Sequence, residues 1–362
     1  MPAQFENILV ISQENIGDVI MSTAAVKLLR EQYPSARITM MTSRECCEIM
    51  RDGVVINETI ADAVPKGTLA RQFYKLRTIW RLRKKRYDAC YFLGHPRRRI
   101  VQLCKYAGIP VRVVGSHTLS GARNASPRRF ATHIVPVTAP IFRHVVDYYQ
   151  DIVQGYNCNG QRHTPFMHVP EYSAAPSQIA HKAATKVAFC FFGKDGNTHR
   201  WPAEYFDALI RKLAEKRIYM FAAVPPGEYN RVTELVARQK WPVDVFSTAS
   251  LGECAACLRR ADLLVAVNTG QTHMAAALNV PVVSISGKDA IRTYPYSSTG
   301  VAVSLVENCP RCRLDANCRI KARRDSRDYL PACIKKLTPD KLYPVIEQML
   351  AGEMPRNRVF LV

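Results

Sequence analysis

Two junctions between an apolar run and a helical segment carry polar side chains suited to proton transfer and anion binding. At the first junction, Gly17 permits a tight turn and the close approach of a ligand, and Asp18 follows it. The Asp18 carboxylate can act as a general base or as a helix N-cap, which accepts backbone N–H groups. Capping preferences alone favour the N-cap.

The second junction follows a run that should end as a strand at Asn268. Thr269 comes next, and Gly270 then turns the chain into a helix. The free N–H groups at such a helix start form an anion site, which the helix dipole strengthens, so a diphosphate there needs no metal. His273, in the first turn, can donate a hydrogen bond to a phosphate oxygen. Alternatively, its ring N–H donates to a neighbouring carbonyl of the protein.

Two further loops also follow strand-like runs. Lys194, His199 and Arg200 can neutralise a leaving diphosphate, unless the segment is an ordinary surface loop. Glu228 follows Val224 and two prolines, where a carboxylate can hydrogen-bond ribose hydroxyls. A glutamate at a helix N-terminus is equally well explained by the helix dipole.

Four of the 12 cysteines form a cluster near the C-terminus. Cys309, Cys312, Cys318 and Cys333 have the spacing C-x2-C-x5-C-x14-C, and four thiolates can hold zinc or iron tetrahedrally. The alternative is four reduced thiols in a basic loop. The remaining cysteines show no disulfide spacing and fit a reducing compartment.

Strand-like and helix-like segments alternate along the chain and position these loops. Strands are expected at 8–12, 37–41, 89–93, 111–115, 187–192, 218–224, 243–246, 263–267 and 282–286. Helices are expected at 19–31, 69–86, 98–107, 143–155, 203–216, 228–238, 252–260, 271–278 and 339–349. This order predicts an α/β fold of two doubly wound, Rossmann-like domains with parallel sheets, whose ligands bind at the carboxyl ends of the strands in a cleft.

A polar stretch at 171–177 divides the two repeats and is the expected linker. The predicted domains are residues 1–170, which bind the acceptor, and residues 171–337, which bind the nucleotide. A last helix and tail, residues 338–362, are expected to pack back on the N-terminal domain. The 362 residues suit two domains, and no apolar run reaches 18 residues or resembles a signal peptide, which favours the cytoplasm.

The formal charge of +21 is concentrated in one part of the chain. Between Lys66 and Arg129 there are seventeen basic residues and one acid, Asp88. Such a segment is either a solvated helix face or a surface that attracts nucleic acid, an anionic membrane or a phosphorylated lipid. The near absence of acids favours the second interpretation.

The ordered set of motifs resembles the lipopolysaccharide heptosyltransferases, family 9 of the glycosyltransferases. The resemblance covers nearly the whole chain and rests on Gly17-Asp18, His199-Arg200-Trp201-Pro202, and Asn268-Thr269-Gly270 with His273. It implies a GT-B fold, an ADP-heptose donor in the C-terminal domain and a lipopolysaccharide inner-core acceptor in the N-terminal domain. It also implies inverting transfer without a metal for chemistry, with Asp18 as the base.

This chain differs from the family pattern at two positions, and the family also offers a comparison for the C-terminal cysteines. The family usually has Asp where this chain has Asn268, which loses a charge, and often Lys where it has His199, a pH-dependent cation. Similar C-terminal cysteines occur in many members, and one branch that glycosylates autotransporter proteins holds iron there.

This resemblance suggests a partner for the basic segment, namely the phosphorylated acceptor in the membrane. Gly17 is expected to contact the acceptor, and six cations are expected to hold lipid or core phosphate on the inner face of the inner membrane. These are Lys84, Lys85, Arg86, Arg97, Arg98 and Arg99. Three alternatives remain: another nucleotide sugar or a protein acceptor on the same fold, a non-catalytic relative that binds the sugar nucleotide, and a nucleic-acid-binding protein. No recognised nucleic-acid module supports the last, so no nucleic-acid partner is expected.

Overall fold

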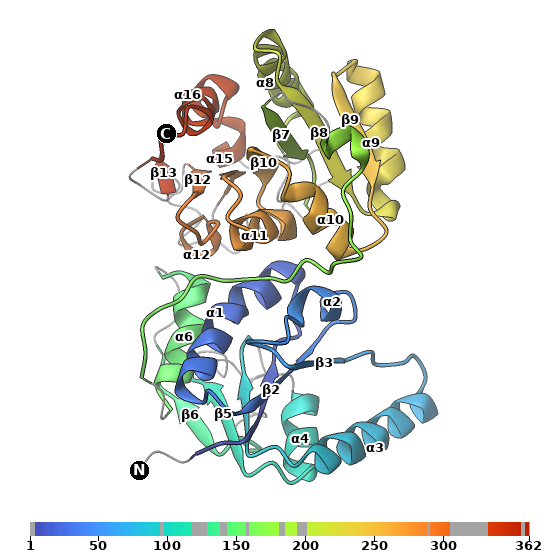
Figure 1. The fold of residues 1–362 in the computed structure, drawn as a ribbon, viewed down its shortest axis with the longest axis vertical. Helices are drawn as coiled ribbons and strands as arrows, with labels where there is room; N and C mark the ends of the chain where they lie inside the picture. Colours follow the sequence, from blue (N-terminus) through green and yellow to red (C-terminus); the bar gives the residue numbers. More distant parts are fainter. Residues whose placement is uncertain are drawn as a thin grey trace. The chain divides into compact units, whose positions relative to one another are not determined.

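The computed structural model divides the chain into two compact units, Met1–His168 and Val169–Val362 (Figure 1). It describes residues 4–94, 98–116, 129–137, 143–156, 159–180, 185–193, 201–287, 290–304, 332–355 and 359–361. No helix among these described ranges is both long and apolar enough to cross a membrane.

The first unit contains a parallel sheet of six strands in the order β3-β2-β1-β4-β5-β6. The strands are β1 (Asn7–Ile11), β2 (Arg37–Thr42), β3 (Glu58–Ala61), β4 (Ala89–Phe92), β5 (Val111–Gly115) and β6 (His133–Val135). Its helices are α1 (Ile16–Gln32), α2 (Cys47–Met50), α3 (Thr68–Lys85), α4 (Arg98–Tyr106) and α6 (Val145–Gln154). The central strands β1 and β4 are almost entirely apolar and buried, as expected where helices cover both faces of a sheet.

The second unit repeats this plan with seven parallel strands in the order β13-β12-β11-β10-β7-β8-β9. The strands are β7 (Lys186–Cys190), β8 (Tyr219–Val224), β9 (Val243–Ser247), β10 (Leu263–Val267), β11 (Val282–Ile285), β12 (Gly300–Ser304) and β13 (Val359–Leu361). The helices are α7 (Ser177–Ala180), α8 (Ala203–Glu215), α9 (Pro226–Gln239), α10 (Leu251–Leu258), α11 (Gly270–Ala277), α12 (Ala290–Thr293), α15 (Ala332–Lys335) and α16 (Pro339–Leu350). The predicted α/β class with two doubly wound sheets is therefore confirmed.

Helix α16 belongs to the core of the second unit. Leu342, Val345 and Ile346 are buried in the apolar cluster that surrounds Phe206 of α8. Lys216, directly after α8, also pairs with Glu347 on α16. The spacing of these apolar residues gives α16 one buried stripe, and the nearest cover for that stripe is α8.

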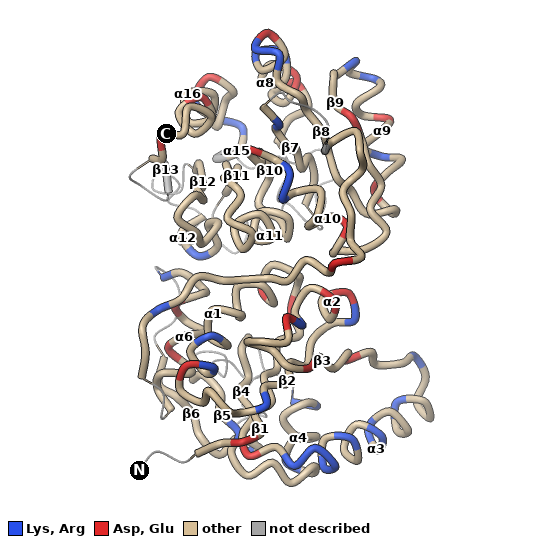
Figure 2. The backbone as a smooth tube through the Cα atoms, in the orientation of Figure 1, with Lys and Arg blue, Asp and Glu red and all other residues tan. Residues whose placement is uncertain are grey.

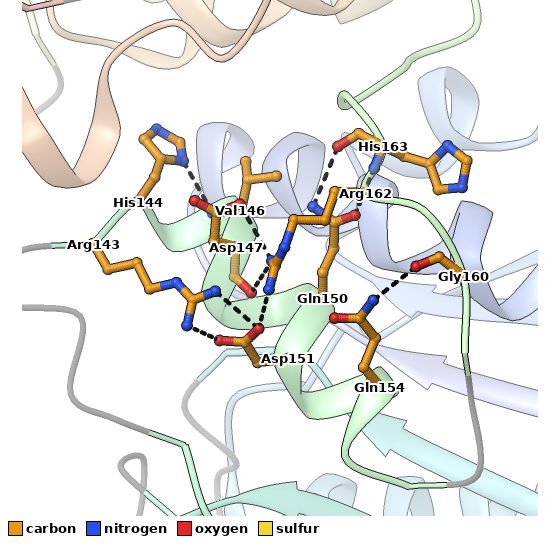
Figure 3. Close-up of polar contacts among 10 residues, drawn as sticks. All are labelled: Arg143, His144, Val146, Asp147, Gln150, Asp151, Gln154, Gly160, Arg162 and His163. Carbon is orange, nitrogen blue, oxygen red and sulfur yellow. Dashed lines mark hydrogen bonds and ion pairs between the residues drawn. The ribbon is translucent and has the colours of Figure 1, made fainter.

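The segment that leads to the second unit is held against α6 (Figure 3). Arg162 pairs with Asp147 and Asp151, and Gln150 accepts from the backbone N–H of His163 at 2.7 Å. Further along, the Thr23 hydroxyl accepts from the N–H of Phe166 at 2.8 Å. These contacts keep the segment in the first unit as far as residue 168, so the division falls just before the predicted polar linker.

Both sheets use an aspartate to join their two halves at the amino ends of the strands. Asp88 accepts from the N–H of Asn7 at 2.8 Å, and its own N–H donates to the Asn7 carbonyl at 2.9 Å. Asp262 makes the same two contacts with Lys186, at 2.7 and 2.9 Å. Asn7 and Lys186 are the first residues of β1 and β7, so the one acid of the basic segment has a structural role.

Substitution of either aspartate by alanine should therefore destabilise its unit. Asp88→Ala and Asp262→Ala each remove a charged acceptor from strand N–H groups, and each should lower the free energy of unfolding by about 1–2 kcal/mol. Urea unfolding measures this, with Asp340→Ala as the control because its ion pair with Lys212 is largely exposed. Equal stability of all three variants would contradict the structural role.

Candidate functional site

Each sheet has one topological switch point, where the chain leaves one side of the first strand and resumes on the other. In the first unit it lies between β1 and β4, and in the second between β7 and β10. In open α/β sheets, ligands bind at the carboxyl ends of the strands beside such a point. The loops after β1 and β10 carry the residues singled out in the sequence, Asp18 and Asn268 with Thr269.

Asp18 lies in the first turn of α1 and is not its N-cap. The helix begins at Ile16, and Asn15 occupies the cap position with extended backbone angles, φ −68° and ψ 163°. The capping interpretation of Asp18 is therefore wrong. Asp18 is half-buried, Gly17 beside it is buried, and the Asn15 side-chain amide donates to the Asp18 carboxylate at 3.4 Å. The helix dipole favours a negative charge at this position.

The loop after β1 meets the loop after β4 across the first switch point. Gly94 has φ +119°, and a Cβ at this position would lie 3.1 Å from the Cγ of Glu14. Sequence reasoning assigned no role to Glu14, although it adds a second carboxylate to this edge. Ser12 Oγ and Gln13 Nε2 are buried and have no hydrogen-bond partner within the described residues. Unpaired buried polar atoms at the ligand edge of a sheet indicate groups that a ligand can satisfy.

At the second switch point, Thr269 is the N-cap of α11 but its side chain does not cap the helix. The Thr269 hydroxyl instead lies 3.6 Å from the Cys190 thiol at the end of β7. The Asn268 amide donates to the Thr293 hydroxyl at 2.9 Å. The Thr269 side chain therefore leaves the N–H groups of Gly270 and Gln271 available to an anion, whereas the N–H of Thr272 donates to the Thr269 carbonyl at 3.2 Å.

The carboxyl ends of the neighbouring strands β10, β7 and β8 converge at this point. The Gln271 amide donates to the carbonyl of Ala223 in β8 at 2.7 Å, a contact that local sequence patterns did not predict. Glu228, half-buried in the first turn of α9, acts electrostatically on Cys190. Burial mainly raises the pKa of the Cys190 thiol to about 11, the Thr269 hydroxyl opposes this, and the charge of Glu228 adds to it. The Cys190 thiol is therefore protonated and uncharged where it lies beside the site.

His273 is 5% exposed, and its Nδ1 has no hydrogen-bond partner within the described residues. Burial lowers the pKa of His273 to about 4. The ring is therefore neutral at physiological pH and carries one N–H donor and no positive charge.

The third predicted loop falls mostly outside the described residues. Lys194, His199 and Arg200 lie outside the described residues. Trp201, which follows them, is buried and donates from its indole N–H to the carbonyl of Leu337 at 2.7 Å. Pro202 is the N-cap of α8. Trp201 therefore anchors the residues just before α8 to the segment before α16.

The predicted cysteine cluster also lies mostly outside the described residues. This is true of Cys309, Cys312 and Cys318, whereas the backbone of Cys333 lies in α15. Within the part of the chain that is described, no group of three or more His, Cys, Asp or Glu side chains could hold a metal ion.

The predicted basic surface divides between two edges of the first sheet. Lys84 and Lys85 end α3, and Arg86 is its C-cap, shortly before the amino end of β4. Lys85 lies 2.5 Å from Glu58, the first residue of β3. This group is therefore at the amino edge, opposite Asp18.

Arg98 and Arg99 instead begin α4, beyond the carboxyl end of β4, while Arg97 lies outside the described residues. Arg99 is paired with Asp62 at 2.7 Å, directly after β3, and the side chain of Arg98 is exposed. Of the predicted acceptor cations, the described members at the same edge as Asp18 are thus Arg98 and Arg99.

Comparison with known proteins gives matches over nearly the whole chain. The model of glycosyltransferase family 9 (heptosyltransferase) matches residues 77–322. Lipopolysaccharide heptosyltransferase 2 of Escherichia coli strain K12 is 24% identical over 373 residues, which cover 96% of this chain and 99% of that protein.

Two solved structures share the fold. The family 9 glycosyl transferase from Veillonella parvula has a TM-score of 0.77 at 18% identity, covering 98% of this chain and 99% of that one. Escherichia coli heptosyltransferase WaaC with ADP-2-deoxy-2-fluoro heptose has a TM-score of 0.65 at 18% identity, covering 94% and 99%. These likenesses confirm the expected GT-B class.

Proposed function

The chain belongs to glycosyltransferase family 9 and is a glycosyltransferase, and we propose that it moves heptose from ADP-heptose to the inner core of lipopolysaccharide. The observation that carries the proposal is the uncapped start of α11 at the second switch point, where a diphosphate can bind. The matched Escherichia coli protein is named lipopolysaccharide heptosyltransferase 2, and WaaC was solved with an ADP-heptose analogue.

The donor site uses the three strand ends that converge in the second unit. The N–H groups that begin α11 at Gly270 bind the diphosphate, and His273 donates one further hydrogen bond as a neutral ring. Glu228 accepts from ribose hydroxyls, and Lys194 with Arg200 offsets the charge of departing ADP. Asn268 in place of the family aspartate removes one negative charge beside the diphosphate.

The acceptor reacts at the first unit. An acceptor hydroxyl oxygen attacks the anomeric carbon, the bond from that carbon to the diphosphate oxygen breaks, and Asp18 takes the hydroxyl proton. Attack opposite the leaving group inverts the anomeric centre. Gly17 is buried beside Asp18, and its lack of a side chain leaves room for the acceptor.

Ligand-dependent melting and transfer assays test this function together. ADP-heptose should raise the melting temperature more than UDP-glucose or ADP-glucose, because a ligand of the native state stabilises it. Heptose should then appear on a heptose-deficient lipopolysaccharide core. A larger shift with another nucleotide sugar would identify a different donor. Binding of ADP-heptose without transfer to this core would point to a protein acceptor or a binding-only relative.

We also propose a structural zinc or iron ion at Cys309, Cys312, Cys318 and Cys333. The support is the spacing of four thiols, which can satisfy a tetrahedral ion. Such an ion takes no part in the transfer step. Elemental analysis of the purified protein tests this beside Cys309→Ser/Cys312→Ser, and a metal-free wild-type protein would contradict it.

A further inference from the structure

Helix α3 carries four large apolar side chains that are exposed. Leu69, Phe73, Leu76 and Trp80 are 76%, 72%, 66% and 63% exposed, and together they are called the α3 stripe below. Scattered apolar residues are normal on a protein surface, but a contiguous exposed set marks an interaction site. The α3 stripe therefore needs a partner.

The spacing of the α3 stripe places it on a single face of the helix. Its members are four, three and four residues apart, and at about 100° per residue they fall within roughly 60° of one another. Thr78 and Leu82 are the buried residues of α3, and they lie on the opposite side. One face of α3 therefore packs on the protein, and the α3 stripe on the other side faces outward.

Positive charge surrounds the α3 stripe. The helix carries seven Lys and Arg residues and no acid, and its blue positions are spread along most of its length in Figure 2. Arg77 and Lys84 border the stripe on one side and Arg83 on the other. The Lys84 ammonium lies 5.4 Å from the centre of the Trp80 ring. A partner must therefore be apolar at its interior and negatively charged at its surface.

Specific contacts fix which face of α3 points outward. Asp62 accepts from the Tyr74 hydroxyl and pairs with Arg99 of α4 at 2.7 Å, and the Arg99 guanidinium lies 5.5 Å from the centre of the Tyr74 ring. Leu82 is buried in the core of the first unit. In Figure 1, the first half of α3 projects beyond the rest of this unit. These contacts hold the helix in place with the α3 stripe turned away from the core.

We propose that α3 docks this protein on an anionic lipid bilayer, with the α3 stripe inserted among the lipids. Leu, Phe and Trp on one face and Lys or Arg around them are the composition of helices that lie in a membrane interface. The inference rests on the proposed function in one respect, since the lipid-linked acceptor would then be presented in the same membrane.

Vesicle flotation of the full-length protein tests the proposal. Phosphatidylcholine vesicles with about a quarter phosphatidylglycerol should bind the wild-type protein, and pure phosphatidylcholine should bind it much less. Phe73→Ser/Leu76→Ser should weaken binding to the anionic vesicles by about tenfold. The matched control is Val54→Ser/Tyr172→Ser, because these side chains are 73% and 76% exposed and lie outside α3. Equal binding by the stripe variant and the wild type would overturn the proposal.

Trp80 supplies an internal probe of insertion. The other two tryptophans, Trp201 and Trp241, are 2% and 5% exposed, so a blue shift on adding anionic vesicles should come from Trp80 and disappear in Trp80→Phe. If the wild type ignores vesicles and instead forms a dimer that Phe73→Ser/Leu76→Ser abolishes, the partner is a second copy and the proposal is wrong.

A separate readout distinguishes docking from the reaction. The stripe variant should show the wild-type melting shift with ADP-heptose and should transfer normally to a delipidated core, with a loss only on vesicle-embedded acceptor. Absence of transfer by every variant on every acceptor would count against the proposed function, whereas the flotation result would still decide the docking.

Discussion

Replacing Asp18 by asparagine is expected to reduce the transfer rate by about 10²–10⁴-fold, the usual contribution of a general base. Asparagine keeps the size of the side chain and can still accept from Asn15, but it cannot take a proton from the acceptor hydroxyl. Single-turnover transfer measures the loss. The ADP-heptose melting shift should be unchanged, because the donor is proposed to bind the second unit.

Glu14→Gln is the matched comparison for this variant. It removes the other carboxylate of the same loop, which lies beside Gly94 at the same switch point. Glu14→Gln should retain most of the activity if Asp18 is the base. The opposite pattern, with Asp18→Asn active and Glu14→Gln inactive, would move the base to Glu14.

Lowering the pH from 6.5 to 4 is expected to lower the free energy of unfolding by about 3 kcal/mol through His273 alone. In the folded protein burial lowers the pKa of this ring to about 4, whereas the unfolded chain has the ordinary value of 6.5. Between these values the unfolded state binds the proton and the folded state does not. Stability is therefore unaffected above pH 6.5 and falls as the pH decreases through this window.

His273→Asn isolates this contribution, because other titrating groups are common to both proteins. Urea unfolding of the two proteins between pH 7.5 and 4.5 gives the difference in stability at each pH. A pH-independent effect of the substitution on the free energy of unfolding shifts this difference equally at every pH, so it does not affect how the difference changes with pH. The wild type should lose more stability than the variant on acidification, and parallel curves would contradict a buried neutral ring.

The sequence was sufficient for the repeating α/β pattern because the central strands are nearly continuous apolar runs. Edge strands were harder: β3 begins with Glu58 and Thr59, and β6 begins with His133, so neither has a clear apolar pattern. The N-cap of α1 was misplaced because Asp and Asn have similar capping preferences, and Asn15 has the extended backbone angles that a cap requires.

The loops that form the site could be predicted, but their contacts could not. Gln271 and Ala223 are 48 residues apart in sequence, and Glu14 meets Gly94 only because β1 and β4 are adjacent in the sheet. The periodicity of α3 also predicts a helix without telling which of its apolar residues are buried. Only the fold shows that Leu82 packs inward and Phe73 does not.

The aspartates at the amino edges have a consequence for how such a protein can evolve. Asp88 and Asp262 join the strands at one end of each sheet, whereas Asp18, Thr269 and Glu228 lie at the other end. Substitutions or insertions in the carboxyl-edge loops therefore leave the joining contacts intact. Lineages with this fold can then acquire new donors or acceptors by changing loops, at little cost in stability.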